Sequence, residues 1–319
     1  MRLLALALAL VACKNDDDTV SNGVCLEPSS CSTPSEAPLS DDVDLTGETF
    51  ANVFVDGDRL YRSSWSGSTH VFDLSDPSTP SATTTLPGGP YTHGHEGVLL
   101  NAPTLADAAT GDPVGALPES LERVTARLAA GSRIVGLHEP DRTLAWGTLD
   151  GTEVKDVVVS NALVALCAGP CVDVLEAVSE THAVVTITGT DVTLTALFDL
   201  SSDGEPIVLD GVFDALAIGP EHLYGSVGNE LQVVELATGD AVGTLPDANV
   251  PFSLTWGPGA LVGTTAGGIQ AFDLSDPTAP APACSFPLDG SLYQRRIHEL
   301  VWYAARPQGL DVIDLRCSP

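Results

Sequence analysis

The sequence predicts an all-β protein assembled from repeated four-stranded units. Three observations indicate this fold class: repeated segments, short alternating runs between turn residues, and a composition unsuited to long helices. The 319 residues include 30 Gly and 23 Pro but a single Met, and Gly and Pro interrupt helices and mark turns. Because 44% of the residues are hydrophobic, the chain can build a core, unlike an acidic disordered chain.

Two segments recur along the chain. Residues 71–80 (VFDLSDPSTP) match residues 271–280 (AFDLSDPTAP) at seven of ten positions, and residues 109–118 (ATGDPVGALP) match residues 237–246 (ATGDAVGTLP) at eight of ten. Weaker copies lie at 197–201 and 310–315. The acidic residues that mark the copies are Asp73, Asp107, Asp199, Glu235, Asp273 and Asp314. Where copies are adjacent, these markers lie 34 to 41 residues apart. This period is typical of one blade of a β-propeller.

The first unit shows the pattern expected within a blade. Four short runs are predicted as strands: residues 52–55, 60–65, 69–74 and 82–86. Turn residues separate them, so the unit is predicted to be a four-stranded meander. Asp-Pro at residues 76–77, repeated at 276–277, is expected to end the third strand because proline cannot donate to a sheet ladder.

The number of blades is predicted as seven or eight, with seven favoured. Blade starts are expected near residues 50, 91, 121, 154, 181, 212, 249 and 291, and two central units are short enough to be one. The last unit stops after its third strand at 310–315, so residues before Phe50 are expected to add a fourth strand and close the ring. Closure removes exposed sheet edges. An open β-solenoid or two β-sandwiches are the alternative architectures.

The repeat resembles a known family. A hydrophobic residue followed by Asp-Leu-Ser-Asp-Pro, as around Asp73 and Asp273, resembles the LVIVD repeat of bacterial exported proteins. The match is partial around Asp199, Glu235 and Asp314, and it is absent from roughly 119 to 180. The resemblance implies β-propeller blades.

The N-terminus has the layout of an export signal. Arg2 precedes an apolar run, and small residues lead to Cys13; the run is too short to span a bilayer as a helix. Leu10-Val11-Ala12-Cys13 resembles the lipobox of bacterial lipoproteins, which implies removal of residues 1–12 and lipid on Cys13. A plain secretory signal is the alternative. Lys14 stands where Asp favours inner-membrane retention, so the resemblance implies an outer-membrane anchor, on either face.

Residues 13–48 are expected to form a flexible tether between the lipid and a propeller over residues 49–319. Residues 14–48 contain nine acids, one base and no aromatic residue. Such a segment cannot bury enough apolar area to offset the entropy of ordering it. It should extend through the repulsion of its own charges.

Six cysteines remain besides Cys13. An even number in an exported chain favours disulfides, although six cysteines allow 15 pairings. We expect two local loops, Cys25–Cys31 and Cys167–Cys171, and a third pair, Cys284–Cys317. Zinc is the rival interpretation, but neither local pair has a histidine nearby.

The charge balance limits the partners. The chain holds 43 acids against 13 Lys and Arg, a formal charge of −30. Nucleic-acid binding and electrostatic docking on an anionic membrane both need basic groups, so neither is expected. Membrane attachment should then occur through the N-terminal lipid alone.

A search for catalytic motifs is negative. The sequence lacks a nucleophile elbow, a Walker loop, a dinucleotide-binding glycine motif and a His-Glu-x-x-His zinc motif. We therefore expect no catalytic residue, metal or cofactor.

Two sets of residues are candidates for ligand binding. His93 and His95 alternate on one face of a predicted inner strand, and Arg295, Arg296 and His298 enter the equivalent place in the last blade. Together they could hold a metal or a small anion at the mouth of the channel; the alternative is that they are ordinary polar channel or loop residues. The other set is Trp65, Trp146, Trp256 and Trp302, which could bind carbohydrate or protein on a propeller face or pack between blades.

These observations favour a non-catalytic binding or scaffold module anchored at the cell envelope, with a protein or carbohydrate partner. The alternative is a propeller enzyme, a hydrolase or lyase that uses a metal or a His-Glu pair at the channel mouth, an idea that rests on fold analogy.

Overall fold

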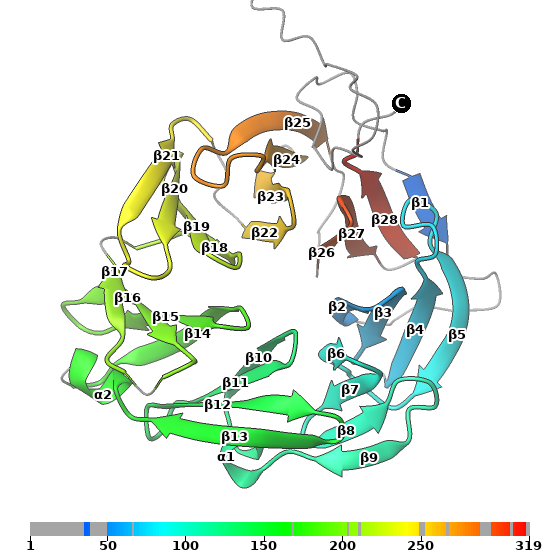
Figure 1. Cartoon of the computed structure of the whole chain (residues 1–319), viewed down its shortest axis with the longest axis horizontal. Coiled ribbons are helices and arrows are strands. Elements are labelled where there is room, and N and C mark those ends of the chain that lie inside the picture. The colour runs from blue at the N-terminus through cyan, green and yellow to red at the C-terminus, as the bar shows by residue number, and fades with distance from the viewer. Residues whose placement is uncertain are drawn as a thin grey trace, which may run out of the picture.

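The fold is a ring of seven sheets. The computed structural model describes residues 35–38, 50–65, 67–167, 169–202, 204–209, 212–248, 253–265, 268–287, 295–306 and 309–316. Their strands form seven four-stranded antiparallel sheets, arranged as blades around a common axis (Figure 1). The predicted all-β propeller is confirmed, with seven blades.

Each blade is a meander of four strands. Blade 1 comprises β2 (Phe50–Asp56), β3 (Arg59–Ser64), β4 (Ser68–Asp73) and β5 (Ser81–Pro87). Blade 2 comprises β6 (His93–His95), β7 (Val98–Asn101), β8 (Thr104–Asp107) and β9 (Pro113–Ala116). Blade 3 comprises β10 (Ala126–Ala130), β11 (Arg133–His138), β12 (Thr143–Asp150) and β13 (Glu153–Ser160). Blade 4 comprises β14 (Val172–Val178), β15 (His182–Thr188), β16 (Thr193–Asp199) and β17 (Ile207–Leu209).

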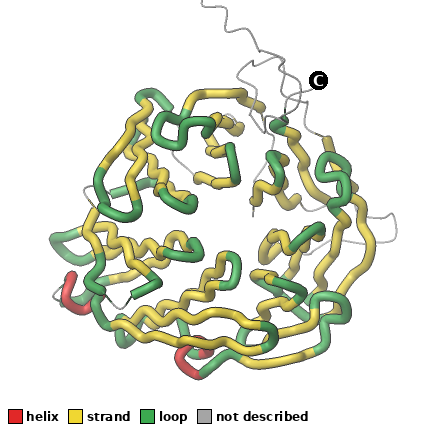
Figure 2. Tube along the Cα trace, in the orientation of Figure 1, coloured by secondary structure: helices red, strands yellow, loops and turns green. Residues whose placement is uncertain are grey.

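The remaining blades follow the same plan. Blade 5 comprises β18 (Ala215–Ile218), β19 (His222–Val227), β20 (Glu230–Glu235) and β21 (Ala241–Leu245). Blade 6 comprises β22 (Ser253–Gly257), β23 (Ala260–Thr265), β24 (Gly268–Asp273) and β25 (Ala281–Pro287). Blade 7 comprises β26 (Arg295–His298), β27 (Val301–Arg306), β28 (Gly309–Asp314) and β1 (Ser35–Pro38). Two single-turn helices, α1 (Glu119–Glu122) and α2 (Leu163–Leu166), follow blades 2 and 3 (Figure 2).

The N-terminal strand closes the ring. β1 pairs antiparallel with β28, from Ser35 opposite Val312 to Pro38 opposite Gly309. The expected contribution of a strand from before Phe50 is therefore confirmed. β1 nevertheless lies within residues 13–48, the segment assigned to the tether, so the propeller includes residues 35–38 and does not begin at residue 49. The composition of the segment could not reveal this, because four paired residues change it little.

The centre of the chain corrects two predicted blade starts. Residue 154 lies inside β13, the outermost strand of blade 3, and residue 181 lies in the turn between β14 and β15. Blade 4 instead begins at Val172. β13 (EVKDVVVS) is rich in valine, as an inner strand can be, so sequence alone misplaced it as the start of a blade.

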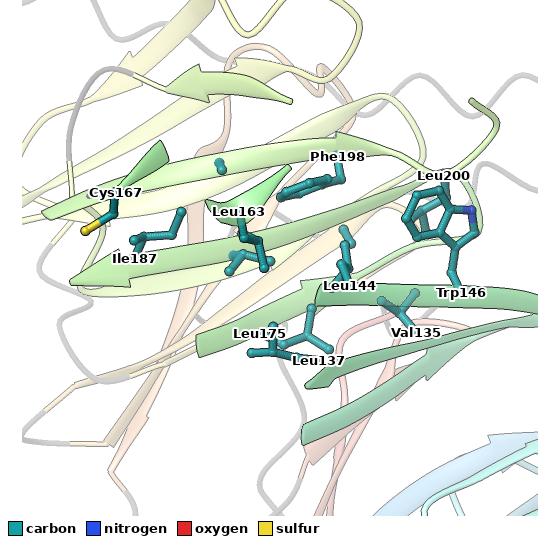
Figure 3. Packing of buried hydrophobic residues seen from close by; sticks show 13 residues of the cluster. Val135, Leu137, Leu144, Trp146, Leu163, Cys167, Leu175, Ile187, Phe198 and Leu200 are labelled. Carbon is teal, nitrogen blue, oxygen red and sulfur yellow. The ribbon is translucent and has the colours of Figure 1, made fainter. Parts of the chain in front are cut away.

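The core is divided among the interfaces between blades. The buried apolar residues form seven clusters, each between two neighbouring blades. Figure 3 shows the cluster between blades 3 and 4, to which Leu144 and Trp146 of blade 3 and Phe198 and Leu200 of blade 4 contribute. Trp302 is buried between blades 6 and 7, and Trp256 packs at the interface of blades 5 and 6, whereas Trp65 is 63% exposed. Three of the four tryptophans thus pack between blades.

The acidic markers of the repeat have one structural role. Each is the last residue of the third strand of its blade. In blade 3 the same place is occupied by Asp150, a copy that the sequence comparison missed. The carboxylate of Asp73 accepts the backbone N–H of Ser75, and that of Asp107 accepts those of Ala109 and Thr110. The repeat is therefore a turn-forming device.

The two glycines of the Ala-Thr-Gly-Asp repeat are also explained. Gly111 and Gly239 have φ of +78° and +76°, which glycine adopts without the clash of a Cβ. Gly115 and Gly243 lie against the backbone of the next blade: a Cβ there would be 2.3 Å from the Thr152 carbonyl oxygen and 2.0 Å from that of Thr278. The repeat thus brings neighbouring blades into close contact.

Candidate binding surface on blades 7, 1 and 2

The predicted ligand-binding residues lie on two inner strands. β6 carries His93 and His95, and β26 carries Arg295, Arg296 and His298. Both strands pack against β2, the inner strand of blade 1, so the two groups flank one blade (Figure 1). His95 and His298 hold equivalent places, since each is the last residue of its strand and is followed by a glutamate of positive φ.

His93 has a structural role between two blades. Its side chain is buried, and Nε2 lies 2.8 Å from the carbonyl oxygen of Gly131, in the turn after β10. Burial lowers the pKa of His93 to about 4, so at neutral pH the imidazole is uncharged and donates Nε2–H to that carbonyl. This residue ties blade 2 to blade 3.

Arg295 is directed toward blade 6. Its guanidinium donates to the hydroxyl of Ser253, the first residue of β22. Burial lowers the pKa of Arg295. The hydroxyl of Ser253 also lies 2.7 Å from that of Thr264. Arg295 is therefore part of the packing between blades 6 and 7 and is not available at the axis.

Arg296 and His298 lie on the other face of β26. The side chain of Arg296 is exposed, yet desolvation by the surrounding protein lowers its pKa. His298 lines a hollow of about 380 Å³ between blades 7 and 1, with Gly57, Asp58, Leu74, Ser75 and Glu299. The structure thus separates the five candidate residues: His93 and Arg295 hold blades together, and His95, Arg296 and His298 remain partly or fully accessible.

A second, larger hollow lies between blades 1 and 2. It measures about 700 Å³ and shares Gly57 and Asp58 with the first. Its acidic lining residues are Asp56, Asp58, Asp73 and Glu96, and its one basic lining residue is Arg59. Both hollows open on the side of the ring that carries the turns after the first and third strands of each blade. We call this side the motif face, because it bears the repeated acids.

Asp56 organises the boundary between the two blades. Its carboxylate accepts the backbone N–H groups of Glu96 and Gly97, each at 2.9 Å. Tyr61 lines the same hollow; its ring stacks on Phe54 with centroids 5.0 Å apart, and burial raises the pKa of its hydroxyl. In the sequence, Asp56-Gly57-Asp58 is recognisable only as one of the turns between the first two strands of blade 1, so this surface was not predicted. The repeated acids at the ends of the third strands were the feature of the sequence that could have indicated this surface.

Of the other predicted site residues, the cysteines, three lie within the described part of the chain. Cys167 is disulfide-bonded to Cys171, and Cys284 also takes part in a disulfide. Cys13, Cys25, Cys31 and Cys317 lie outside the described residues. Within the described part of the chain, no group of three His, Cys, Asp or Glu side chains is arranged to hold a metal. Nor does that part contain a helix of the length and apolarity needed to cross a membrane.

Comparison with known proteins identifies the fold. No protein-family model and no curated protein sequence matches the chain. Among solved structures, the WD40 domain of Pan2 from Neurospora crassa matches with a TM-score of 0.62 and 12% identity, over 91% of this chain and 96% of that one. A chain of the mitotic checkpoint complex matches at 0.58 and 12%, over 98% of each. The computationally designed Ika8 matches at 0.55 and 11%, over 87% and 99%. At these identities the likeness shows the propeller fold alone.

Proposed function

We propose that the chain is a lipid-anchored exported protein whose propeller binds a protein partner at the cell envelope without catalytic turnover. The lipobox resemblance at Leu10–Cys13 supports export and lipid anchoring, and the LVIVD-like repeats support the propeller architecture. The observation that carries the proposal is the pair of hollows on the motif face of blades 7, 1 and 2. A rigid ring with a concave polar surface suits recognition.

The lining of the larger hollow favours a basic partner segment. A volume of about 700 Å³ lies within the range of ligand sites. Asp58, Asp73 and Glu96 place carboxylates around it, and the net charge of −30 adds a field that attracts cations over a longer range. A Lys or Arg side chain could enter between blades 1 and 2 while the rest of the segment lies across the turns.

The position of β1 supports a propeller held near the membrane. Roughly 20 residues separate the proposed lipid site Cys13 from Ser35, which limits the reach to about 70 Å when extended. The chain enters β1 at the end that pairs with Val312, near the motif face. The partner is therefore sought among proteins of the same membrane.

Crosslinking in intact cells tests the binding surface. A variant with Asp58→Asn and Glu96→Gln should capture at least tenfold less of the wild-type partner. The matched control, Glu119→Gln with Glu122→Gln, removes two acids from α1 on the opposite side of the ring and should leave capture unchanged. Equal effects of the two variants, or none from the first, would exclude the hollows as the site.

Two further measurements test the remaining parts of the proposal. Cys13→Ser should abolish labelling by a palmitate analogue and release the chain from membranes; retention of label would contradict the lipid assignment. The purified chain should show no turnover of ester, glycoside or phosphoester substrates. Turnover that is lost in the His95→Ala variant would contradict a binding module and indicate an enzyme.

A further inference from the structure

The two motif-face hollows are separated by a single turn. Gly57 and Asp58, which connect β2 to β3, line both hollows. Gly57 has a φ of +56°, and a Cβ at this position would meet no atom within 4 Å. The wall between the hollows is therefore a backbone turn that carries no side chain at its first residue. An extended segment of a partner has room to pass over it from one hollow into the other.

A glutamate stands on each side of this turn. Glu299 follows β26 and Glu96 follows β6, which is the place in blades 7 and 2 that Gly57 occupies in blade 1. Their φ values are +46° and +48°, a region that glycine enters more easily than glutamate does. Glu299 lines the smaller hollow and Glu96 lines the larger one. The gap at Gly57 thus lies between two carboxylates.

Three carboxylates around the gap are available to a ligand. Within the described part of the chain, the exposed side chains of Asp58, Glu96 and Glu299 accept no hydrogen bond and form no ion pair. By contrast, the carboxylate of Asp56 accepts two backbone N–H groups of blade 2, and that of Asp73 accepts one in the turn after β4. Each hollow therefore offers two unoccupied carboxylates, and that of Asp58 is common to both.

Arg59, the one basic lining residue of the larger hollow, leaves these carboxylates uncompensated. It lies in sheet register between Asp56 and Asp73, and its side chain donates a hydrogen bond to the hydroxyl of Tyr61. Its charge is therefore matched by the acids of its own row. The two hollows together have five acidic lining residues and this single base, so the remaining charge attracts more than one cationic group.

The other lining residues favour long side chains over free ions. Leu74 in the smaller hollow is buried, as are Tyr61, Val71 and Ala108 in the larger one. Lysine and arginine combine an aliphatic stem with a charged end. The stem can lie on these apolar residues while the charged end reaches a carboxylate. Among the described residues, no three acids are grouped so as to hold a metal ion.

We propose that the partner segment is extended and carries two basic side chains at alternate positions, one for each hollow. Alternate residues of an extended chain point to the same side, about 7 Å apart, whereas adjacent residues point to opposite sides. One basic side chain binds Asp58 and Glu96, the other binds Asp58 and Glu299, and the residue between them lies over Gly57. The inference rests on the proposed function, because it specifies the partner of the same surface.

Calorimetric titration with end-capped peptides in 0.15 M salt tests the spacing. The protein is the full exported chain carrying Cys13→Ser. The peptide Ser-Lys-Ser-Lys-Ser should bind at least tenfold more tightly than Ser-Lys-Ser-Ser-Ser. The isomer Ser-Lys-Lys-Ser-Ser has the same charge but directs its lysines to opposite sides, so it should bind at least fivefold more weakly than the first peptide. Equal affinities of the two dibasic peptides overturn the proposal.

Two variants locate the second lysine. Glu299→Gln should weaken Ser-Lys-Ser-Lys-Ser at least fivefold and leave the single-lysine peptide unchanged, since the larger hollow alone can hold one lysine. Its matched control is Glu221→Gln, which removes an exposed acid from the β18–β19 turn of blade 5. Gly57→Asn should also weaken the dibasic peptide at least fivefold, because asparagine tolerates positive φ and places a side chain in the gap.

Gly151→Asn is the control for the glycine variant, since Gly151 has a φ of +57° and equally open surroundings. It and Glu221→Gln should change no affinity. A dibasic peptide that keeps its full advantage over the single-lysine peptide in Glu299→Gln overturns the proposal. So does a loss that the two control variants share.

The crosslinking experiment distinguishes failure of this inference from failure of the proposed function. If capture of the partner depends on Asp58 and Glu96, but two lysines bind no better than one, the binding surface stands and recognition of a dibasic segment fails. If capture is unchanged without these two acids, the proposed function fails, whichever peptide binds best.

Discussion

Arg142 and Asp173 form a two-pronged ion pair that joins blade 3 to blade 4. Nε and Nη2 of Arg142 lie 2.7 and 2.8 Å from the two carboxylate oxygens of Asp173, whose side chain is buried. Nη1 donates to the carbonyl oxygen of Cys167, at 2.9 Å, next to the disulfide with Cys171. One side chain thus holds the β11–β12 turn, the connection between the blades and the start of β14.

Breaking this ion pair should destabilise the propeller strongly. Asp173→Asn leaves a mostly buried guanidinium without its counter-charge, which costs about 3 kcal/mol in comparable buried pairs. Urea unfolding measures the loss. Arg142→Met combined with Asp173→Leu should recover part of it, because no uncompensated charge remains. Asp150→Asn, which breaks the exposed pair with Lys155, is the control and should cost far less. Equal losses at the two sites would contradict the role of burial.

Removing β1 should open the ring. A chain without residues 35–38 loses the hydrogen bonds to β28 and exposes that strand as a sheet edge. About four backbone hydrogen bonds at about 1 kcal/mol each set the scale of the loss. Thermal unfolding and light scattering should show a lower melting temperature and association that grows with concentration. A chain lacking residues 14–24 keeps β1 and both Cys25 and Cys31 and should behave as the wild type; a monomeric, equally stable deletion of 35–38 would contradict the closure.

Gly243→Ala should destabilise through the neighbouring blade. The added methyl group would meet the backbone oxygen of Thr278 at 2.0 Å, and backbone cannot move as easily as a side chain. Overpacking of this kind costs about 1–3 kcal/mol. Gly115→Ala repeats the test at the equivalent position beside Thr152. Gly204→Ala, next only to the flexible Ser202 hydroxyl, is the control. Chemical denaturation should rank both repeat variants below it.

Stability should fall as the pH drops from 6.5 to 4. In the unfolded chain His93 takes up a proton near pH 6.5, but burial lowers its pKa in the folded chain to about 4. Over that window the unfolded state binds more protons, so the free energy of unfolding decreases by up to about 1.4 kcal/mol per pH unit.

His93→Gln provides the comparison for this pH dependence. Glutamine can still donate to Gly131 but does not titrate, so the slope between pH 6.5 and 4 should shrink. Half-buried His182, whose pKa burial also lowers, is replaced by Gln in both proteins so that it does not contribute. If the free energy of unfolding of His93→Gln depends on pH as steeply as that of the wild type, another titrating group causes the effect.

Much of the fold could be predicted where turn chemistry marks the strands. In blade 1 the predicted strands 52–55, 60–65, 69–74 and 82–86 each overlap an observed strand by most of their length. The two blade starts predicted near residues 154 and 181 were wrong, because the repeat loses its signature there and the long strands β12 and β13 replace the usual short ones. Local pattern sets strands, but the division into blades depends on packing between them.

The candidate site was predictable only in part. Alternation correctly placed His93 and His95 together on an inner strand, yet it could not show that Gly131, 38 residues away, would occupy the imidazole of His93. Likewise, nothing in the sequence distinguishes Arg295 from Arg296, which project from opposite faces of β26. The motif-face hollows arise from the approach of turns in different blades, a relationship that no local window contains.

The pairing of β1 with β28 also means that blade 7 can be completed only when both strands have been synthesised. The ring closes only when residues 35–38 and 309–314 are present in the same chain, so a chain truncated during synthesis leaves blade 7 without its outer half. Such a product would expose unpaired strands to proteases and chaperones. The closing blade thereby distinguishes finished molecules from fragments, whatever the finished molecule binds.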